Sequence, residues 1–200
     1  MYKNYIFDFG KVLVEFEPEY MTKQYIENED DVKIAQEVIF DRLYWDKLDA
    51  GTITDQEVID GIKSRLPERL HKAAVDAYNH WYYHLPFVDG MCEVIEEIKT
   101  NGGKLFLLSN ISLTFAKNWQ NVDSLNKLFS LFDGLVFSAE VDMMKPNKDI
   151  FEYLISKYNI KASETVFIDD SLKNIKGAEV VGIKGYLFDG DAEKLKQNIL

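Results

Sequence analysis

Several short segments of the sequence place reactive side chains directly after apolar runs, a pattern that points to one shared site. Because the carboxyl ends of parallel strands line the binding crevice of an open α/β sheet, we expect side chains that follow such runs to converge. The predicted site would bring together three carboxylates, a hydroxyl and an ammonium group. Its members are Asp8, Ser109 with Asn110, and Asp169 with Asp170, together with Lys145, which follows its run after a short loop.

The predicted cluster of carboxylates needs a positive partner, since neighbouring carboxylates repel one another. Mg²⁺ is the simplest partner, because it binds a few carboxylate oxygens together with waters and substrate phosphate. Asp8 is then a metal ligand, a nucleophile that attacks phosphorus, or both through its two oxygens. Lys145 would neutralise the nucleophile and the phosphate, while Ser109 and backbone N–H groups would bind phosphate oxygens.

Each member also has a simple structural explanation when it is taken alone. Asp, Ser and Asn residues often cap the helix that follows a strand, which would account for Ser109, Asp170 or Ser171. An isolated lysine such as Lys145 is most often a solvated surface residue. Asp8 has no comparable explanation, and the ordered set is far more specific than any one of its members.

Five apolar runs are predicted to be the strands that position this site. Each is too short for a helix, is rich in residues that favour strands, and lacks the alternation of a half-exposed strand. Strands of this kind are typical of a parallel sheet that is buried on both faces. The runs are Tyr5–Phe7, Lys104–Leu108, Gly134–Phe137, Thr165–Ile168 and Gly185–Phe188.

The pattern between these strands predicts a doubly wound, Rossmann-like α/β domain with a helical insertion. Apolar residues at helical spacing alternate with the strands from about residue 90 to the end of the chain. The region from about 15 to 85 shows helical periodicity instead, and Thr54 with Glu57 forms a capping-box start within it. We therefore predict a core domain of residues 1–14 and 86–200, interrupted by a small α-helical cap domain of residues 15–85, called the cap below.

Composition narrows the classes of partner and compartment. The net charge of −11 repels phosphate backbones, so we expect no nucleic-acid partner. Cys92 is the single cysteine, which fits a reducing compartment. No apolar run reaches the length of a membrane-spanning helix, so we expect no membrane partner and a cytoplasmic location. Whether the protein is a monomer or a dimer is left open.

The ordered motifs resemble those of the haloacid dehalogenase-like (HAD) hydrolase superfamily over essentially the whole chain. Phe7–Leu13 is similar to the first motif, Leu107–Asn110 to the second, and Lys145-Pro146 to the third. Phe167–Ser171 resembles the fourth motif, and Asn174–Ala178 continues it. The insertion resembles the family's small helical cap. Among subgroups, the chain resembles bacterial sugar phosphatases similar to α-D-glucose-1-phosphate phosphatase, which share a glycine in the first motif.

This resemblance implies a Mg²⁺-dependent phosphatase that acts on small phosphorylated metabolites, with sugar phosphates as the expected class. It implies that Asp8 is the nucleophile and also a Mg²⁺ ligand. The other metal ligands would be the carbonyl of Gly10 and the carboxylate of Asp170, with Asp169 as a water-mediated or outer partner of the metal. The phosphoryl group would be held by Ser109, Asn110 and Lys145.

The first motif departs from the family pattern at Gly10. Family phosphatases usually carry an aspartate there as general acid and base, a function typically worth about 10²–10⁴-fold in rate. Substrates with good leaving groups would need little of this help, or hydrolysis would be slow, or another residue would supply it. The candidates for that replacement are Lys11, Glu15, Asp46 and Asp49.

Three other functions remain as alternatives to the phosphatase. A regulatory module would bind phosphate without hydrolysing it, because Gly10 cannot transfer a proton. A dehalogenase-like hydrolase would attack carbon without a metal, but the pair Asp169-Asp170 would then repel with no cation between them. A phosphomutase is disfavoured, since mutases of this fold also use an acid and base beside the nucleophile.

The cap is rich in aromatic residues, which could either pack within the cap or line the substrate crevice. Most are expected to form the core of the cap, while a few would face the crevice and close over a small polar substrate. His80 and His84 lie four residues apart on a predicted helix, a weak signal for a metal site. Asn118 and Trp119 are further candidates for lining the site. The aromatic residues are Tyr20, Tyr25, Phe40, Tyr44, Trp45, Tyr78, Trp81, Tyr82 and Tyr83.

Overall fold

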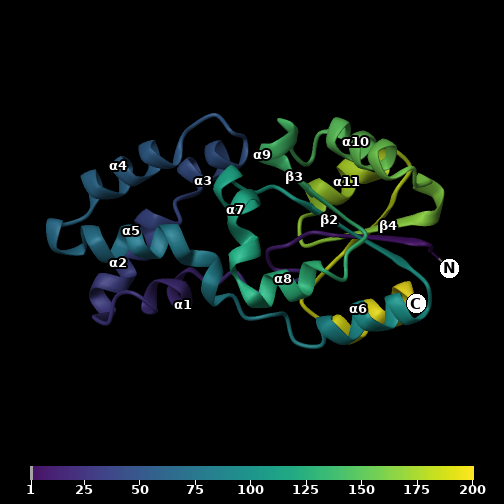
Figure 1. The fold of residues 1–200 in the computed structure, drawn as a ribbon, viewed down its shortest axis with the longest axis horizontal. Helices are drawn as coiled ribbons and strands as arrows, with labels where there is room; N and C mark the ends of the chain where they lie inside the picture. The colour runs from purple at the N-terminus through teal and green to yellow at the C-terminus, as the bar shows by residue number, and fades with distance from the viewer. Residues whose placement is uncertain (1) are drawn as a thin grey trace.

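A computed structural model describes residues 2–200, and its centre is a parallel sheet of five strands in the order β3-β2-β1-β4-β5 (Figure 1). Each of the five predicted apolar runs forms one of these strands, to within one residue at either end. The doubly wound α/β fold class is therefore confirmed. The strands are β1 (Asn4–Phe7), β2 (Lys104–Ser109), β3 (Gly134–Phe137), β4 (Thr165–Asp169) and β5 (Lys184–Leu187).

The sheet is buried on both faces because successive strand residues point to opposite sides. Ile6 and Phe167 pack with the residues of one apolar cluster, whereas Tyr5 and Phe7 belong to the other. The first cluster lies under α10 (Lys148–Tyr158) and α11 (Leu172–Val180). The second lies against α6 (Met91–Thr100), α8 (Asp123–Phe129) and α12 (Ala192–Ile199), and Figure 1 shows these two helical layers above and below the sheet.

The register of the strands brings their carboxyl ends level with one another. Phe7 pairs with Leu107 on one side of β1 and with Ile168 on the other. The amide N–H of Asp8 then donates to the carbonyl of Ile168 at 2.9 Å. Residues that follow β1, β2 and β4 therefore share one edge of the sheet, which is the arrangement predicted from the sequence.

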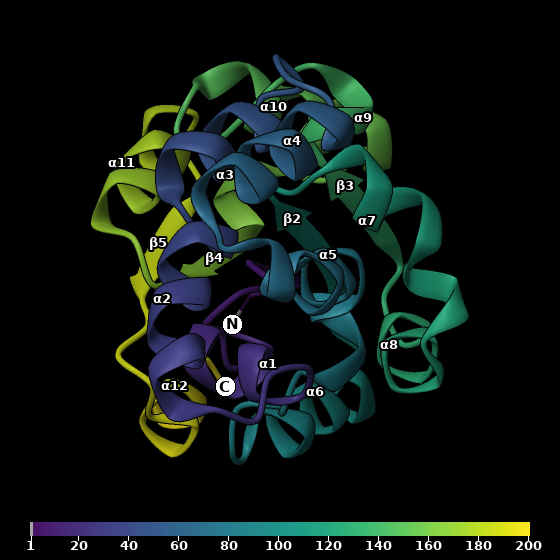
Figure 2. The same cartoon turned by 90° about the vertical axis from the view of Figure 1, so that its left-hand side faces the viewer.

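The segment between β1 and α6 is helical and forms a separate group at one end of the molecule, seen at the left of Figure 1 and facing the viewer in Figure 2. The predicted capping box of Thr54 and Glu57 is confirmed at the start of α4. The helices are α1 (Pro18–Lys23), α2 (Glu29–Ile39), α3 (Arg42–Asp49), α4 (Asp55–Arg65), α5 (His71–His80), and the 3₁₀ helices η1 (Glu68–Leu70) and η2 (Trp81–His84).

The two chain crossings between this group and the sheet domain run side by side. Val14 forms an antiparallel bridge with Phe87, and the N–H of Glu15 donates to the carbonyl of Pro86 at 2.8 Å. This pairing lies at the positions where the sequence predicts the boundaries of the cap. It supports the division into residues 1–14 with 86–200 and residues 15–85, which stays a prediction.

An aromatic cluster joins the cap to the sheet domain. Phe16 contacts Trp45 and Trp81 with ring centroids 5.7 Å apart in each pair. Trp81 then stacks on Phe115 at 5.6 Å, and Phe115 lies in α7 (Leu113–Asn118) of the sheet domain. Trp45, Trp81 and Phe115 are all buried. As the sequence analysis expects, these cap aromatics form packing surface, although the packing extends across the interface between the two parts.

Candidate active site

The centre of the site is a buried lysine that bridges two carboxylates. The Lys145 ammonium lies 2.6 Å from Oδ1 of Asp8 and 2.8 Å from Oδ2 of Asp169. The side chains of Lys145 and Asp169 are 1% and 0% exposed, whereas that of Asp8 is 14% exposed. Asp8 is therefore the member of this triad that a small molecule can reach.

Asp169 is held by donors on every side. Its carboxylate accepts from Lys145, from the N–H of Ser171 at 2.8 Å, and from the amide of Asn174 at 3.1 Å to each oxygen. A carboxylate with all of these donors is fixed in place and orients Lys145 toward Asp8. The contact from Asn174 was not predicted, although the sequence signal for it was present in the continuation of the fourth motif.

Asn110 has a positioning role that the sequence analysis did not predict. Its amide nitrogen donates to the carbonyl of Lys145 at 2.9 Å, and its Oδ1 accepts from the N–H of Lys145 at 2.8 Å. The end of β2 is thereby tied to the loop that carries the lysine. The predicted contact between Asn110 and a phosphoryl group stays a prediction, and the side-chain amide is already engaged with this loop.

The loop that carries Lys145 is also supported by a close contact with a glycine of α11. A Cβ at Gly177 would lie 2.2 Å from the carbonyl oxygen of Pro146. Only a residue without a side chain fits at this distance.

Substituting Gly177 with alanine should therefore push the Lys145-Pro146 segment out of place. We expect a loss of about 1–3 kcal/mol in the free energy of unfolding, together with reduced activity, because overpacking is relieved only by backbone movement. In an unhindered helix the same change would be stabilising. Chemical denaturation of Gly177→Ala, with the exposed Lys176→Ala on the same helix as control, measures the effect. Equal stability in the two variants would contradict this account of the loop.

Ser109 lies at the end of β2 with a buried hydroxyl. Its one protein contact is a long one of 3.5 Å to the carbonyl of Asn110. The helix that follows is capped by Ser112 instead, whose hydroxyl accepts from the N–H of Phe115 at 3.2 Å. Ser171 makes no side-chain cap at the start of α11 either. The capping explanations for Ser109 and Ser171 are thus wrong, and Ser109 keeps a hydroxyl for a ligand.

Three carboxylates come together as a group that could hold a cation. Asp8, Asp169 and Asp170 each offer one oxygen, and these oxygens lie within 4.8 Å of one another. Asp170 is exposed, whereas Asp169 is fully committed to its protein donors. The oxygen-rich donor set suits a hard divalent cation. Gly10 follows Asp8 by two residues, and its carbonyl as a ligand stays a prediction.

Burial and the neighbouring charge of Asp169 raise the pKa values of Asp8 and Asp170. Burial raises the pKa of Asp8 to about 7, with Asp169 adding to the rise and the Lys145 ammonium opposing it. Burial, and then the charge of Asp169, raises the pKa of Asp170. Burial acts to lower the pKa of Lys145, but Asp8 and Asp169 outweigh it and keep the ammonium charged. The site therefore favours the binding of a cation.

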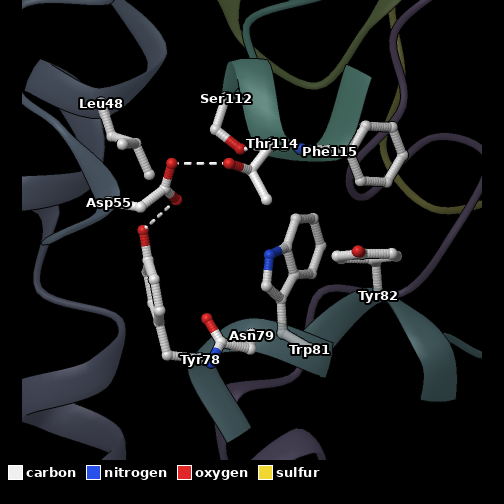
Figure 3. Close-up of a pocket in the computed structure, with 9 residues that line it drawn as sticks. All are labelled: Leu48, Asp55, Tyr78, Asn79, Trp81, Tyr82, Ser112, Thr114 and Phe115. Carbon is white, nitrogen blue, oxygen red and sulfur yellow. Dashed lines mark hydrogen bonds between the residues drawn. The ribbon is translucent and has the colours of Figure 1, made fainter. Parts of the chain in front are cut away.

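Hydrogen bonds join the cap to the sheet domain. Asp55 of α4 accepts from Tyr78 at 2.7 Å and from Thr114 of α7 at 2.5 Å, as Figure 3 shows. The cleft around these residues has a volume of about 10 Å³. That is room for about one water, so these residues of the cap and of the sheet domain pack closely against one another. Residues from both parts line the cleft: Leu48, Asp55, Tyr78, Asn79, Trp81, Tyr82, Ser112, Thr114 and Phe115 (Figure 3).

The remaining sequence candidates lie outside this arrangement. His80 contacts the carbonyl of Asp76 and stacks on Tyr25, and in residues 2–200 neither it nor His84 belongs to a group with three metal-ligating side chains. Asn118 donates to Thr114 at 2.7 Å and Trp119 packs on Phe129. Neither of the last two candidates lines the cleft of Figure 3.

In the absence of a cation the site should make stability depend on pH. Asp8 has an ordinary pKa of 3.8 and a folded pKa of about 7, so the folded protein binds the proton more tightly than the unfolded chain. Stability of the protein in chelator should therefore fall as pH rises from about 4 to about 7. Thermal unfolding at several pH values measures this. The decline should be shallower in Asp8→Asn, and an identical slope in both proteins would contradict the assignment.

The family model for the haloacid dehalogenase-like hydrolases matches residues 2–182. The chain belongs to this family. The motifs of the HAD-like hydrolases thus lie where the geometry above places the site, and the resemblance predicted from the sequence is confirmed. Among residues 2–200, no helix is both long enough and apolar enough to cross a membrane.

Curated relatives of this HAD-like chain include two phosphatases. It is 30% identical over 95 residues to the sesquiterpene phosphatase astK of Aspergillus oryzae, across 48% of this chain and 47% of the relative. It is 32% identical over 92 residues to the glyceraldehyde 3-phosphate phosphatase of Methanocaldococcus jannaschii, across 46% of this chain and 39% of the relative. These matches span about half or less of the relatives' lengths.

The HAD-like chain also matches solved structures over nearly its whole length. A HAD family enzyme from Bacteroides thetaiotaomicron is 26% identical with a TM-score of 0.69, and the match covers 97% of this chain and 98% of that one. Another crystal structure of that enzyme is a magnesium complex, with 25% identity, a TM-score of 0.66 and coverage of 92% of each chain. A third contains magnesium and inorganic phosphate.

Proposed function

We propose that this protein is a Mg²⁺-dependent phosphatase of small phosphorylated metabolites, with Asp8 as its nucleophile. The observation that carries the proposal is the reachable Asp8 carboxylate, 2.6 Å from the buried Lys145 ammonium and within a group of three carboxylates. Without further positive charge, this group of carboxylates would destabilise the folded protein, because buried like charges repel unless cations neutralise them. A divalent cation and a phosphoryl group would complete the balance of charge.

In the proposed phosphoryl transfer, Asp8, Lys145 and Ser109 each have a distinct role. One Asp8 oxygen attacks phosphorus, which forms a bond from Asp8 to the phosphoryl group and breaks the bond to the leaving oxygen. Lys145 offsets the negative charge that gathers between nucleophile and phosphate. Ser109 donates its hydroxyl to a phosphate oxygen. Water then attacks phosphorus, which frees inorganic phosphate and restores the Asp8 carboxylate.

The proposed Mg²⁺ would be held by Asp8, the carbonyl of Gly10 and Asp170, with Asp169 as an outer partner. The hydrogen bonds of Asp169 support this division, since its oxygens already accept from Lys145, Ser171 and Asn174. When bound, the cation would neutralise charge on the phosphoryl oxygens. The magnesium complex of the related Bacteroides enzyme supports the choice of metal.

Sugar phosphates are the substrate class that we propose. Support comes from the glycine in the first motif, which the chain shares with sugar phosphatases, and from the relative that acts on glyceraldehyde 3-phosphate. The cap, which packs on the sheet domain through Trp81 and Phe115, supports a small substrate over a phosphoprotein. We also keep the cytoplasm as the proposed location, because the unpaired Cys92 is exposed and fits a reducing compartment.

A release assay for inorganic phosphate tests the proposed function. The substrates are hexose phosphates, glyceraldehyde 3-phosphate, nucleotides and p-nitrophenyl phosphate, each with Mg²⁺ and with a chelator. We expect release that depends on Mg²⁺ and is fastest with a sugar phosphate. A parallel arm offers a 2-haloacid in chelator. Halide release in that arm, with no phosphate release in the others, would favour the dehalogenase alternative and overturn the phosphatase.

A further inference from the structure

Asp49, the last residue of α3 in the cap, carries a buried carboxylate oxygen without a partner. Its Oδ1 has less than 1 Å² of exposed surface and makes no hydrogen bond within residues 2–200. Leaving such an oxygen unpaired costs about 1–3 kcal/mol, and more when it is charged. Unsatisfied buried groups in a folded protein therefore call for a functional explanation.

A short chain of hydrogen bonds ties the backbone of Asp49 to the segment that follows β2. The hydroxyl of Ser138 donates to the carbonyl of Asp49 at 2.9 Å and accepts from the N–H of Ile111 at 2.9 Å. Ile111 directly follows the Ser109-Asn110 segment at the end of β2. The carboxyl group of Asp49 is also close enough to Lys145 for the ammonium to act on its ionisation. Asp49 is thus tied to the segment that follows β2, and its carboxyl group lies within electrostatic range of Lys145.

The surroundings leave Asp49 able to hold or release a proton near neutral pH. Burial raises its pKa to about 7, while Arg42 and Lys145 lower it and Asp46 raises it. From α5 it faces the Tyr78 hydroxyl, which stays protonated and donates to Asp55. The neighbouring α9 segment (Ser138–Val141) carries Glu140 and is followed by Asp142, and both residues are exposed to solvent.

We propose that Asp49 is the general acid and base of this enzyme and replaces the aspartate that is absent at Gly10. This inference rests on the proposed phosphatase function. It assigns the proton-transfer role to a cap residue, so that the site is complete only when the cap closes over the sheet domain.

The assignment gives a balanced proton cycle. As Asp8 attacks phosphorus, the bond to the leaving oxygen breaks with its electron pair, and protonated Asp49 donates its proton to that oxygen. The product leaves as an alcohol, and Asp49 is left as a carboxylate. It then takes a proton from the water that attacks phosphorus, while the bond to Asp8 breaks. Phosphate is released and both aspartates return to their starting states.

Two of the other candidates for this role, Asp46 and Lys11, fit less well. Asp46 lies on the same helix but is exposed, and it pairs with Arg42 at 2.7 Å. Lys11 is exposed and lies close enough to Asp170 to lower its pKa, so it acts on the metal side of the site. Both side chains are exposed, whereas Asp49 has a buried carboxylate oxygen without a hydrogen-bond partner.

Asp49→Asn tests the proposal, with Asp46→Asn as the matched control. For an alkyl phosphate such as glycerol phosphate, whose leaving group needs a proton, we expect kcat/KM to fall about 10²–10⁴-fold in Asp49→Asn. For p-nitrophenyl phosphate, whose leaving group needs none, kcat/KM should stay within about tenfold of the original protein. Asp46→Asn should resemble the original protein on both substrates.

Two further readouts separate proton transfer from a structural effect. The original protein should lose kcat/KM for the alkyl phosphate as pH rises above about 7, and Asp49→Asn should lack that decline. Rapid mixing of Asp49→Asn with p-nitrophenyl phosphate should give a burst of about one p-nitrophenol per protein, because hydrolysis of the phosphorylated Asp8 has lost its base. A burst also shows that the variant is folded.

Gly10→Asp in the Asp49→Asn background provides a rescue. A Cβ at Gly10 meets nothing within 4 Å, so a side chain can begin there without a clash. We expect the double variant to recover at least tenfold in kcat/KM on the alkyl phosphate. Equal losses on both substrates, an unchanged pH profile or no rescue would overturn the role of Asp49 while leaving the phosphatase intact. Absence of phosphate release from the original protein would instead defeat the proposed function itself.

Discussion

Asp8→Asn is expected to abolish phosphate release while leaving the protein folded. Asparagine has nearly the same shape, but its amide is a poor nucleophile and a weak ligand for a divalent cation. We expect a loss of more than about 10⁴-fold in kcat, as for other residues that form the covalent bond to substrate. The ammonium of Lys145 would still pair with Asp169, 2.8 Å away.

This substitution should also leave stability unchanged or improved in the absence of a cation. Asp8 lies in a buried site beside Asp169, and this environment raises its pKa to about 7. The charged carboxylate of Asp8 is therefore less favourable at neutral pH than it would be in water. Functional sites often trade stability for activity in this way. Phosphate release and thermal unfolding of the two proteins measure both effects. Activity retained at one tenth or more of the original level would exclude Asp8 as nucleophile.

Lys145→Met is expected to destabilise the protein and to inactivate it. Methionine has a similar length but no charge, so Asp8 and Asp169 would be left as buried carboxylates with no cation between them. Removal of one partner from a buried ion pair costs about 3–5 kcal/mol. The same change removes the positive charge that offsets the charge of the phosphoryl group.

Lys148→Met is the matched control for this substitution. Lys148 lies three residues further along the chain, is exposed, and pairs with Glu152 at 3.0 Å, so its loss should cost no more than about 1 kcal/mol. A double variant of Lys145→Met with Asp8→Asn should regain part of the lost stability, because one of the unpaired carboxylates is gone. Denaturation midpoints that match for Lys145→Met and Lys148→Met would contradict the central role of the ion pair.

The strands and the convergence of the site residues could be predicted because their causes are local. Runs such as Leu105–Leu108 are apolar throughout, which indicates burial on both faces, and parallel strands bring their carboxyl ends to one edge. The order of Asp8, Lys145 and Asp169 in the motifs then indicated which groups meet there. The helical cap was predictable from its periodicity and from the capping box of Thr54.

Other features of the site depend on packing that no short stretch of sequence encodes. Asn110 was predicted to bind phosphate, whereas the structure shows its amide on the backbone of Lys145, 35 positions away in the chain. The buried oxygen of Asp49 depends on how α3 is seated by Ser138 against the loop after β2. From the sequence, Asp49 and Asp46 were equal candidates, and the packing of the cap distinguishes them.

The central claim, that Asp8 forms a covalent bond to a phosphoryl group, is tested most directly by trapping that bond. The protein is mixed with Mg²⁺ and a phosphorylated substrate, quenched in acid, digested and analysed by mass spectrometry. We predict one added phosphoryl group on the peptide that contains Asp8, absent in chelator and absent in Asp8→Asn. Phosphate release without any phosphorylated Asp8, or a phosphoryl group on a different residue, would contradict the proposed mechanism.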